Sequence, residues 1–320
     1  MLSLSSLALV ASLLLAPVVD AGGPVGLRPK QIKNLVTFGD SYTDTVIVSN
    51  GGTQWPVYAS GFAKVNLFPF ARSGATCSNN ITFRPFPSLF ESQLPAYFQA
   101  SGRGGNIKVK PEETYTLWLG TNDVGSNALL TGNDNASLVD VTTCMVNWVK
   151  TLYQSGARNF LFQNMIPLQN VPLYAPVSHF SRYWTAQRNS TEWSVFMTEL
   201  VLSGNALTKL MLEALAPSLK GAHIGIFDSH SLFADMFAHP ERYLNGTAPL
   251  NVNGAVQTCV FELNESTSDT GNCTIAQGTD RDSFLWFDEL HPSEQADRIV
   301  AREIAQVIEG KPNQWTRWLS

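Results

Sequence analysis

Short apolar runs alternate with longer amphipathic stretches along most of the chain. The runs predict buried strands over 35–38, 65–70, 114–119, 159–165 and 223–227. The stretches with helical spacing predict helices over 54–62, 136–153, 192–215, 231–238 and 292–308. Strands and helices that alternate in this way form βαβ units. The sequence therefore predicts an α/β fold with a mainly parallel five-stranded sheet covered by helices on both faces.

Polar clusters follow three of these apolar runs, at 39–41, 73–76 and 120–123. The carboxyl ends of parallel strands meet at one edge of the sheet, where open α/β folds place their chemistry. We therefore expect the three loops to lie together and to form a site.

Ser41, in the first cluster, is a candidate nucleophile, and Asp288-Glu-Leu-His291 supplies a candidate base with a carboxylate to orient it. Each fragment also has a simpler interpretation, since Gly-Asp-Ser is a good turn or helix cap and Asp288 and His291 could be polar residues of a helix-entry loop. The other four histidines lack an aspartate three residues ahead in such a loop, and His230, close to Asp228, is the reserve base.

Three N–H groups are candidates for an oxyanion hole: the amides of Ser41 and Gly74 and the side chain of Asn122. Taken singly, Gly74 could be a turn glycine and Asn122 an Asx-turn residue. The ordered occurrence of nucleophile, donors and base at successive strand ends favours a catalytic site over these alternatives.

Composition narrows the class of protein. The chain has 320 residues, 44% hydrophobic and 15% charged, with a net charge of −5 and 21 scattered lysines and arginines. The scattered cations argue against a nucleic-acid partner, which requires clustered positive charge. No composition break, repeat or linker divides the chain, so we expect a single domain over 22–320.

The first 21 residues resemble a secretion signal peptide, because an uncharged apolar stretch ends in small residues at 19–21. A membrane anchor is the alternative, but serines and Pro17 interrupt the stretch, and no later segment is long enough to span a bilayer. The sequence predicts a secreted, extracellular protein without a membrane span.

Cysteines and sequons agree with secretion. The even number of cysteines, without a Cys-x-x-Cys spacing, favours disulfide bonds over metal, with Cys259 to Cys273 and Cys77 to Cys144 preferred among three possible pairings. Six asparagines stand in Asn-x-Ser/Thr sequons and are candidates for N-glycosylation: Asn80, Asn135, Asn189, Asn245, Asn264 and Asn272.

The ordered set of blocks resembles the SGNH, or GDSL, hydrolase superfamily. The blocks are Gly39-Asp-Ser-Tyr-Thr-Asp44, Gly74, Gly120-Thr-Asn-Asp123 and Asp288-x-x-His291. The resemblance covers about 35 to 300 and implies a flavodoxin-like three-layer α/β/α sandwich and esterase chemistry without a metal or other cofactor. By the same resemblance, Ser41 is the nucleophile, His291 the base and Asp288 its orienting acid, and Ser41, Gly74 and Asn122 form the oxyanion hole. Tyr42 stands where the family name has leucine.

A finer resemblance rests on the segments 38–45 and 73–79 together with the secretion signal. They are similar to the secreted fungal acetylesterases of carbohydrate esterase family 16, which implies removal of acetyl groups from hemicellulose-derived oligosaccharides. Two alternatives stay open: a lipolytic or aryl esterase of broader acyl range, and a non-catalytic secreted carbohydrate-binding protein on the same fold. We expect a monomer whose partner is a small-molecule or oligosaccharide ester.

Overall fold

The computed structural model describes residues 26–102, 110–132, 134–269 and 271–320. The predicted signal peptide over 1–21 lies outside these residues. A central sheet of six strands has the order β10-β5-β4-β3-β1-β2. Its strands are β1 (Asn34–Gly39), β2 (Asn66–Pro69), β3 (Glu113–Trp118), β4 (Asn159–Gln163), β5 (His223–Phe227) and β10 (Thr316–Trp318).

The first five strands pair in parallel and correspond to the five predicted runs. Their order, 2-1-3-4-5, is that of flavodoxin-like folds. The predicted number of strands was wrong by one, because β10 adds to the outside of β5 in the antiparallel direction. A three-residue strand is too short to show an alternating pattern, so the sequence carries no signal for it.

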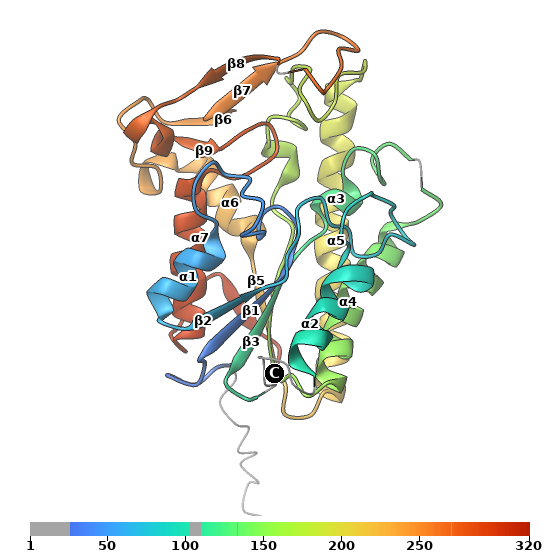
Figure 1. The fold of residues 1–320 in the computed structure, drawn as a ribbon, viewed down its shortest axis with the longest axis vertical. Coiled ribbons are helices and arrows are strands. Elements are labelled where there is room, and N and C mark those ends of the chain that lie inside the picture. The colour runs from blue at the N-terminus through green and yellow to red at the C-terminus, as the bar shows by residue number, and fades with distance from the viewer. Residues whose placement is uncertain (1–25, 103–109, 133, 270) are drawn as a thin grey trace, which may run out of the picture.

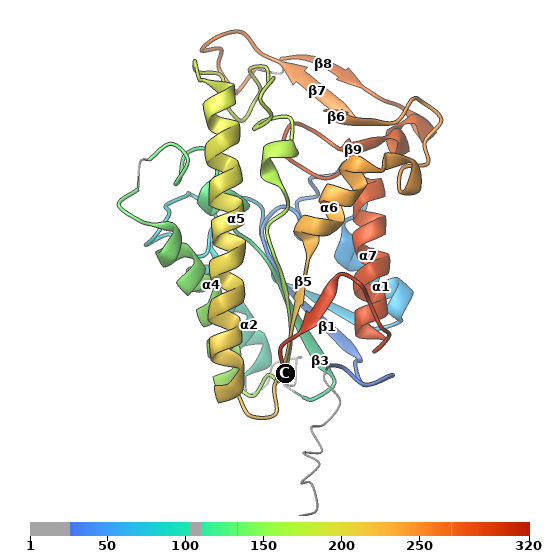
Figure 2. The ribbon, with the colours of Figure 1, turned by 180° about the vertical axis from the view of Figure 1, so that it is seen from behind.

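Helices cover both faces of the sheet, and the three layers are visible in Figures 1 and 2. One face is covered by α1 (Trp55–Ala63), α6 (Ser229–Ala238) and α7 (Glu294–Ile308). The other is covered by α2 (Leu94–Ser101), α4 (Leu138–Gln154) and α5 (Ser190–Leu215). All five predicted helices are present, whereas α2 and the single-turn α3 (Thr121–Val124) were not predicted.

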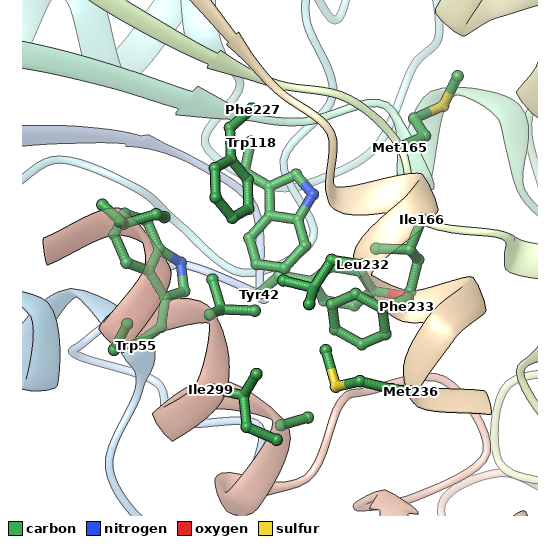
Figure 3. Packing of buried hydrophobic residues seen from close by; sticks show 14 of the residues in the cluster. Tyr42, Trp55, Trp118, Met165, Ile166, Phe227, Leu232, Phe233, Met236 and Ile299 are labelled. Carbon is green, nitrogen blue, oxygen red and sulfur yellow. The ribbon is translucent and has the colours of Figure 1, made fainter. Parts of the chain in front are cut away.

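The core consists of two apolar clusters, one on each face of the sheet, because strand side chains alternate in direction. In β3, Tyr115 and Leu117 join one cluster, while Trp118 points into the other. Figure 3 shows the second cluster, in which Trp118 lies among Trp55, Phe233 and Tyr42. The ring of Tyr42 is thus anchored in the core directly beside Ser41, at a ring distance of 5.4 Å from Trp118.

Two small strand pairs lie beyond the carboxyl edge of the central sheet (Figure 1). They are β6 (Asn251–Ala255) with β9 (Phe284–Trp286), and β7 (Gln257–Val260) with β8 (Asn272–Ile275). Five short helical turns complete the described elements: Leu89–Gln93, Leu168–Asn170, Ala216–Ser218, Pro240–Arg242 and Gly278–Ser283. The two strand pairs therefore lie over the carboxyl edge of the central sheet, where the polar clusters at 39–41, 73–76 and 120–123 meet (Figure 1).

Within the described ranges, the helical segment 190–218 has the length and apolar composition that a membrane span would need, so the expectation that no later segment is long enough was wrong. Length and apolar composition are weak evidence for a membrane span, because core helices of soluble proteins have them too. Here α5 packs against α4 and helps to cover one face of the sheet.

Candidate active site

Ser41 follows β1 in a turn that requires glycine at position 39. Gly39 has a φ of +148°, and a β-carbon there would lie 2.3 Å from the carbonyl oxygen of Trp118. Only a residue without a side chain fits so close an approach. The side chain of Gln93 accepts from the amide of Gly39 at 3.1 Å and donates to its carbonyl at 2.8 Å. The turn is therefore held on a fixed backbone immediately beyond the strand.

Ser41, His291 and Asp288 form a continuous chain of hydrogen bonds. Ser41 Oγ lies 2.9 Å from His291 Nε2, and His291 Nδ1 lies 2.9 Å from Asp288 Oδ1. A carboxylate can only accept, so Nδ1 carries the proton and Nε2 is left to accept from the serine hydroxyl. The three residues are 6–7% exposed. The structure thus brings together the three side chains that the sequence singled out, in the order that proton transfer from serine to histidine requires.

The carboxylate of Asp288 is held in its charged form. Burial alone would raise its pKa, but the charge and hydrogen bond of His291 and the hydroxyl of Tyr183 lower the pKa below its ordinary value. Asp288 Oδ1 also accepts from the amides of Leu290, at 2.9 Å, and His291, at 2.8 Å. The group that faces the imidazole is therefore an ionised and firmly oriented acceptor.

Two tyrosine rings contact the imidazole of His291. The rings of Tyr42 and Tyr183 each lie 5.8 Å from it, centroid to centroid. The hydroxyl of Tyr42 donates to the carbonyl of Leu290 at 2.8 Å and so joins the turn after β1 to the loop that carries the histidine. Leucine, which the family name has at this position, lacks a hydroxyl for this bond.

Gly74 lies on the loop that follows β2, and Asn122 lies in α3, directly after β3, beside the turn that carries Ser41. The amide of Arg72 donates to the carbonyl of Gly39 at 3.1 Å, which ties the loop of Gly74 to that turn. Asn122 donates from Nδ2 to the carbonyl of Ala75 at 3.0 Å. A primary amide has two N–H groups, so this bond leaves one of them for another acceptor. The three predicted loops are thus joined at one edge of the sheet.

Two buried aspartates lie behind the site. Burial raises the pKa of Asp40 to about 7 and the pKa of Asp123 to about 6, although the positive charge of Arg84 lowers both. Asp40 Oδ1 accepts from the amide of Tyr42 at 3.0 Å, whereas Oδ2 has no partner among the described residues. Asp123 accepts from the hydroxyl of Thr82 at 2.7 Å and ties the 77–82 loop to α3. Burial thus favours the neutral form of Asp40.

The other histidines are placed differently. The reserve candidate His230 is at the start of α6, where its amide donates to Asn164 at 2.9 Å, and Ser41 hydrogen-bonds to His291 instead. His179 lies 3.2 Å from the buried carboxylate of Glu289, next to Asp288. Glu289 also accepts from the amide of Cys259 at 2.8 Å. Neither the Glu289 contacts nor Tyr183 was predicted, because their partners are distant in the sequence and no local spacing signals them.

Both preferred disulfide pairings are confirmed. Cys77 is bonded to Cys144, and Cys259 to Cys273 across the β7–β8 pair. The six sequon asparagines are all exposed, as glycosylation would require.

The chain is similar to a family of ester hydrolases and to two acetylesterases. A family model described as GDSL-like Lipase/Acylhydrolase matches residues 35–304. An acetylesterase of Hypocrea jecorina is 29% identical over 89% of this chain and 91% of its own length. An acetylesterase of Thermothelomyces thermophilus is 23% identical over 92% of this chain and 95% of its own. Among solved structures, the chain matches Axe2, an acetylxylan esterase from Geobacillus stearothermophilus, with a TM-score of 0.43 and 14% identity over 87% of this chain and 96% of that one.

The match to the family model covers most of the chain. The chain belongs to the GDSL-like lipase/acylhydrolase family and is a carboxylic ester hydrolase.

Proposed function

We propose that this ester hydrolase removes acetyl groups from carbohydrates, through an acyl-enzyme formed on Ser41. The observation that carries the proposal is the 2.9 Å separation between Ser41 Oγ and His291 Nε2, with Asp288 on the other ring nitrogen. This is the arrangement that makes a serine hydroxyl nucleophilic at neutral pH.

The proposed reaction has two steps. Ser41 Oγ attacks the acetyl carbonyl carbon while His291 Nε2 takes the hydroxyl proton, and the sugar oxygen leaves with that proton. Water then attacks the acetyl-serine and gives a proton to His291, which returns it to Ser41 Oγ as acetate departs. Asp288 keeps the imidazole oriented and stabilises its positive charge in both steps.

We assign the oxyanion of each tetrahedral intermediate to three N–H groups, those of Ser41, Gly74 and the Asn122 side chain. The bond from Asn122 to the carbonyl of Ala75 supports this assignment, because it fixes the amide beside the loop of Gly74. Fixed donors stabilise the developing charge without reorganising during the reaction.

Acetyl carbohydrates as the substrate class are supported by the two fungal acetylesterases, which align with this chain over nearly their whole length. Hemicellulose-derived oligosaccharides are the source that we propose for these esters. A decisive experiment measures acetate release from acetylated xylo-oligosaccharides, acetylxylan and pectin fragments, with p-nitrophenyl esters from acetate to octanoate alongside. We expect turnover to fall steeply beyond propionate. Equal turnover of the octanoate would favour a lipolytic or aryl esterase instead.

The Ser41→Ala variant separates catalysis from mere binding. We expect it to lose aryl acetate hydrolysis, and a variant that retains this activity would contradict the nucleophile assignment. A wild-type protein that binds xylo-oligosaccharides but releases no acetate would favour the non-catalytic alternative.

We further propose that the protein is a secreted, glycosylated monomer with one domain over 22–320. The two disulfides, the six exposed sequon asparagines and the apolar start of the chain support secretion. The protein from the culture medium of a eukaryotic host should begin near residue 22, lose mass on treatment with a peptide N-glycosidase, and elute as a monomer. An intracellular protein that keeps residues 1–21 would contradict secretion.

A further inference from the structure

The segment between the short turn Leu168–Asn170 and α5 brings a phenol to the carboxylate of Asp288. The hydroxyl of Tyr183 donates to Asp288 Oδ2 at 2.6 Å, although the two residues are 105 positions apart in the sequence. The same hydroxyl oxygen lies 3.3 Å from His291 Nδ1. Tyr183 therefore contacts the acid and the base of the proposed reaction at the same time.

We propose that Tyr183 is a positioning residue for acyl transfer, which fixes the rotation of the Asp288 carboxylate and the plane of the His291 imidazole. The inference rests on the proposed function. Tyr183 closes a triangle: its hydroxyl donates to Oδ2, while Nδ1 lies 2.9 Å from Oδ1, 3.1 Å from Oδ2 and 3.3 Å from the phenol oxygen. A short hydrogen bond to a charged acceptor is among the stronger ones in proteins.

The phenol is suited to remain a donor at every working pH. Burial and the negative charge of Asp288 raise the pKa of Tyr183 well above its ordinary value, despite the positive charge of Arg182. The hydroxyl therefore keeps its proton, and its ring lies 5.8 Å from the imidazole at an interplanar angle of 59°. A phenylalanine would preserve this ring contact and remove only the donor.

The segment that carries Tyr183 is itself held by several bonds. Arg188 donates to the carbonyl of His179 at 2.7 Å and to the hydroxyl of Ser178 at 2.9 Å. The carbonyl of Phe180 accepts from the amide of Phe261 at 3.0 Å, which joins the segment to the chain after β7. Tyr183 is therefore presented to Asp288 by a fixed backbone rather than by a free loop.

A second contact holds the residue next to Asp288 from the same side. Glu289 is buried and receives both the ring nitrogen of His179, at 3.2 Å, and the amide of Cys259, at 2.8 Å. Cys259 belongs to the disulfide across the β7–β8 pair. The segment that carries Tyr183 and the β7–β8 pair thus both contact the loop that carries the acid and the base.

Removal of the Tyr183 hydroxyl should change the pH dependence of kcat/KM, which a residue that only stabilises the fold would not do. Tyr183 withdraws part of the negative charge of Asp288, so its loss leaves more of that charge to hold a proton on the imidazole. The acid limb of the kcat/KM profile then moves to higher pH. The other titratable groups around this pair are Asp288 on the loop of His291, and Asp40 and Tyr42 on the turn after β1. The charges of Arg182 and Glu289 act on Tyr183. All of them are unchanged in the variant.

The test compares Tyr183→Phe with Tyr153→Phe, a matched control whose hydroxyl donates to the carbonyl of Lys220 at 3.0 Å. With p-nitrophenyl acetate, we expect Tyr183→Phe to lower kcat about 10-fold or more, the factor expected for a hydrogen bond to a charged group. KM should stay within about 2-fold, and the acid limb of the kcat/KM profile should move to higher pH. The control variant should match the wild type in kcat, in KM and in the position of the acid limb.

A double-mutant cycle supplies the second measurement. If Tyr183 acts through the carboxylate, Tyr183→Phe should change kcat less than about 2-fold when Asp288→Asn is already present. A full additional loss in that background would overturn the proposal. So would wild-type kcat and pH profile in Tyr183→Phe, or loss of its fold where Tyr153→Phe stays folded. Ser41→Ala keeps the two claims apart: activity in that variant refutes the proposed function, whereas an inactive Ser41→Ala with an unaffected Tyr183→Phe refutes only this inference.

Discussion

Ser41 Oγ and His291 Nε2 lie 2.9 Å apart, although 250 positions separate the two residues in the sequence. The parallel sheet places the turn after β1 at its carboxyl edge, and the loop before α7 returns to the same edge. The hydroxyl of Tyr42 bonds that loop to the turn through the carbonyl of Leu290. The contact between nucleophile and base is thus a product of the fold, stabilised by the bond from the Tyr42 side chain, next to Ser41, to the backbone of Leu290, next to His291.

Replacement of Asn122 by alanine should lower kcat by about 10²–10³-fold, the usual cost of one lost oxyanion donor. KM should change little, because the bond to the substrate strengthens as charge develops on the oxygen. Steady-state kinetics with p-nitrophenyl acetate measures both. Asn66→Ala, which removes an exposed amide bonded to Asn34, is a suitable control. Unchanged kcat in Asn122→Ala would remove this residue from the oxyanion hole.

The buried carboxyl of Asp40 should make stability depend on pH. Its pKa is about 7 in the folded protein and near 4 in the unfolded chain, so between these values only the unfolded state releases the proton. Stability is therefore lost as pH rises from about 4 to about 7, by about 1.4 kcal/mol per pH unit at most. Asp40→Asn mimics the neutral form and should remove this loss.

Melting temperatures of the wild type and of Asp40→Asn between pH 4 and 8 test this expectation. Asp123, with a pKa of about 6, contributes in the same direction in both proteins, so the difference between their curves reports on Asp40 and on its coupling to Asp123. The stability of the variant relative to the wild type should increase with pH and level off above about 7. A constant difference would show that folding does not change the pKa of Asp40.

The two disulfides should contribute unequally to stability. They close loops with sequence separations of 67 for Cys77–Cys144 and 14 for Cys259–Cys273. In the chain-entropy model these are worth about 4 and about 3 kcal/mol, respectively. Denaturant unfolding of the two paired serine variants measures the difference.

The Cys259–Cys273 pair should also affect catalysis, because the amide of Cys259 is bonded to Glu289 beside Asp288. We expect its serine variant to lose several-fold in kcat and the Cys77–Cys144 variant to lose more stability. Equal losses of kcat in the two variants would mean that the β7–β8 pair does not support the site.

Most of the sheet was predictable because its strands are buried on both faces and consist of apolar residues, as in β1 and β5. The outer strand β10 and the four strands β6 to β9 were not, because they are short and partly polar, and their pairing depends on tertiary contacts. In β8, for example, all four residues are exposed. The expectations for this region that came from the sequence were the cystine that links β7 to β8 and the sequons at Asn264 and Asn272.

The candidate site divides in the same way. Ser41, Asp288 and His291 lie in short local patterns, and their chemistry follows from residue type and spacing. Tyr183 stands in no such pattern, and its role depends on a segment that folds back over 105 positions to meet Asp288. A contact of this kind can be predicted only when the tertiary path of the chain is known, and no local sequence pattern indicates that path.

Covalent trapping of the nucleophile is the most direct test of the account. The protein is incubated with a p-nitrophenyl alkylphosphonate, an ester whose adduct on serine is stable, and the modified peptide is identified by mass spectrometry. We expect one adduct per chain, on Ser41, with loss of activity in proportion to labelling, and a rate of labelling that falls at least about 10²-fold in His291→Ala. An adduct on another residue, or full activity in a protein labelled at Ser41, would contradict the central claim.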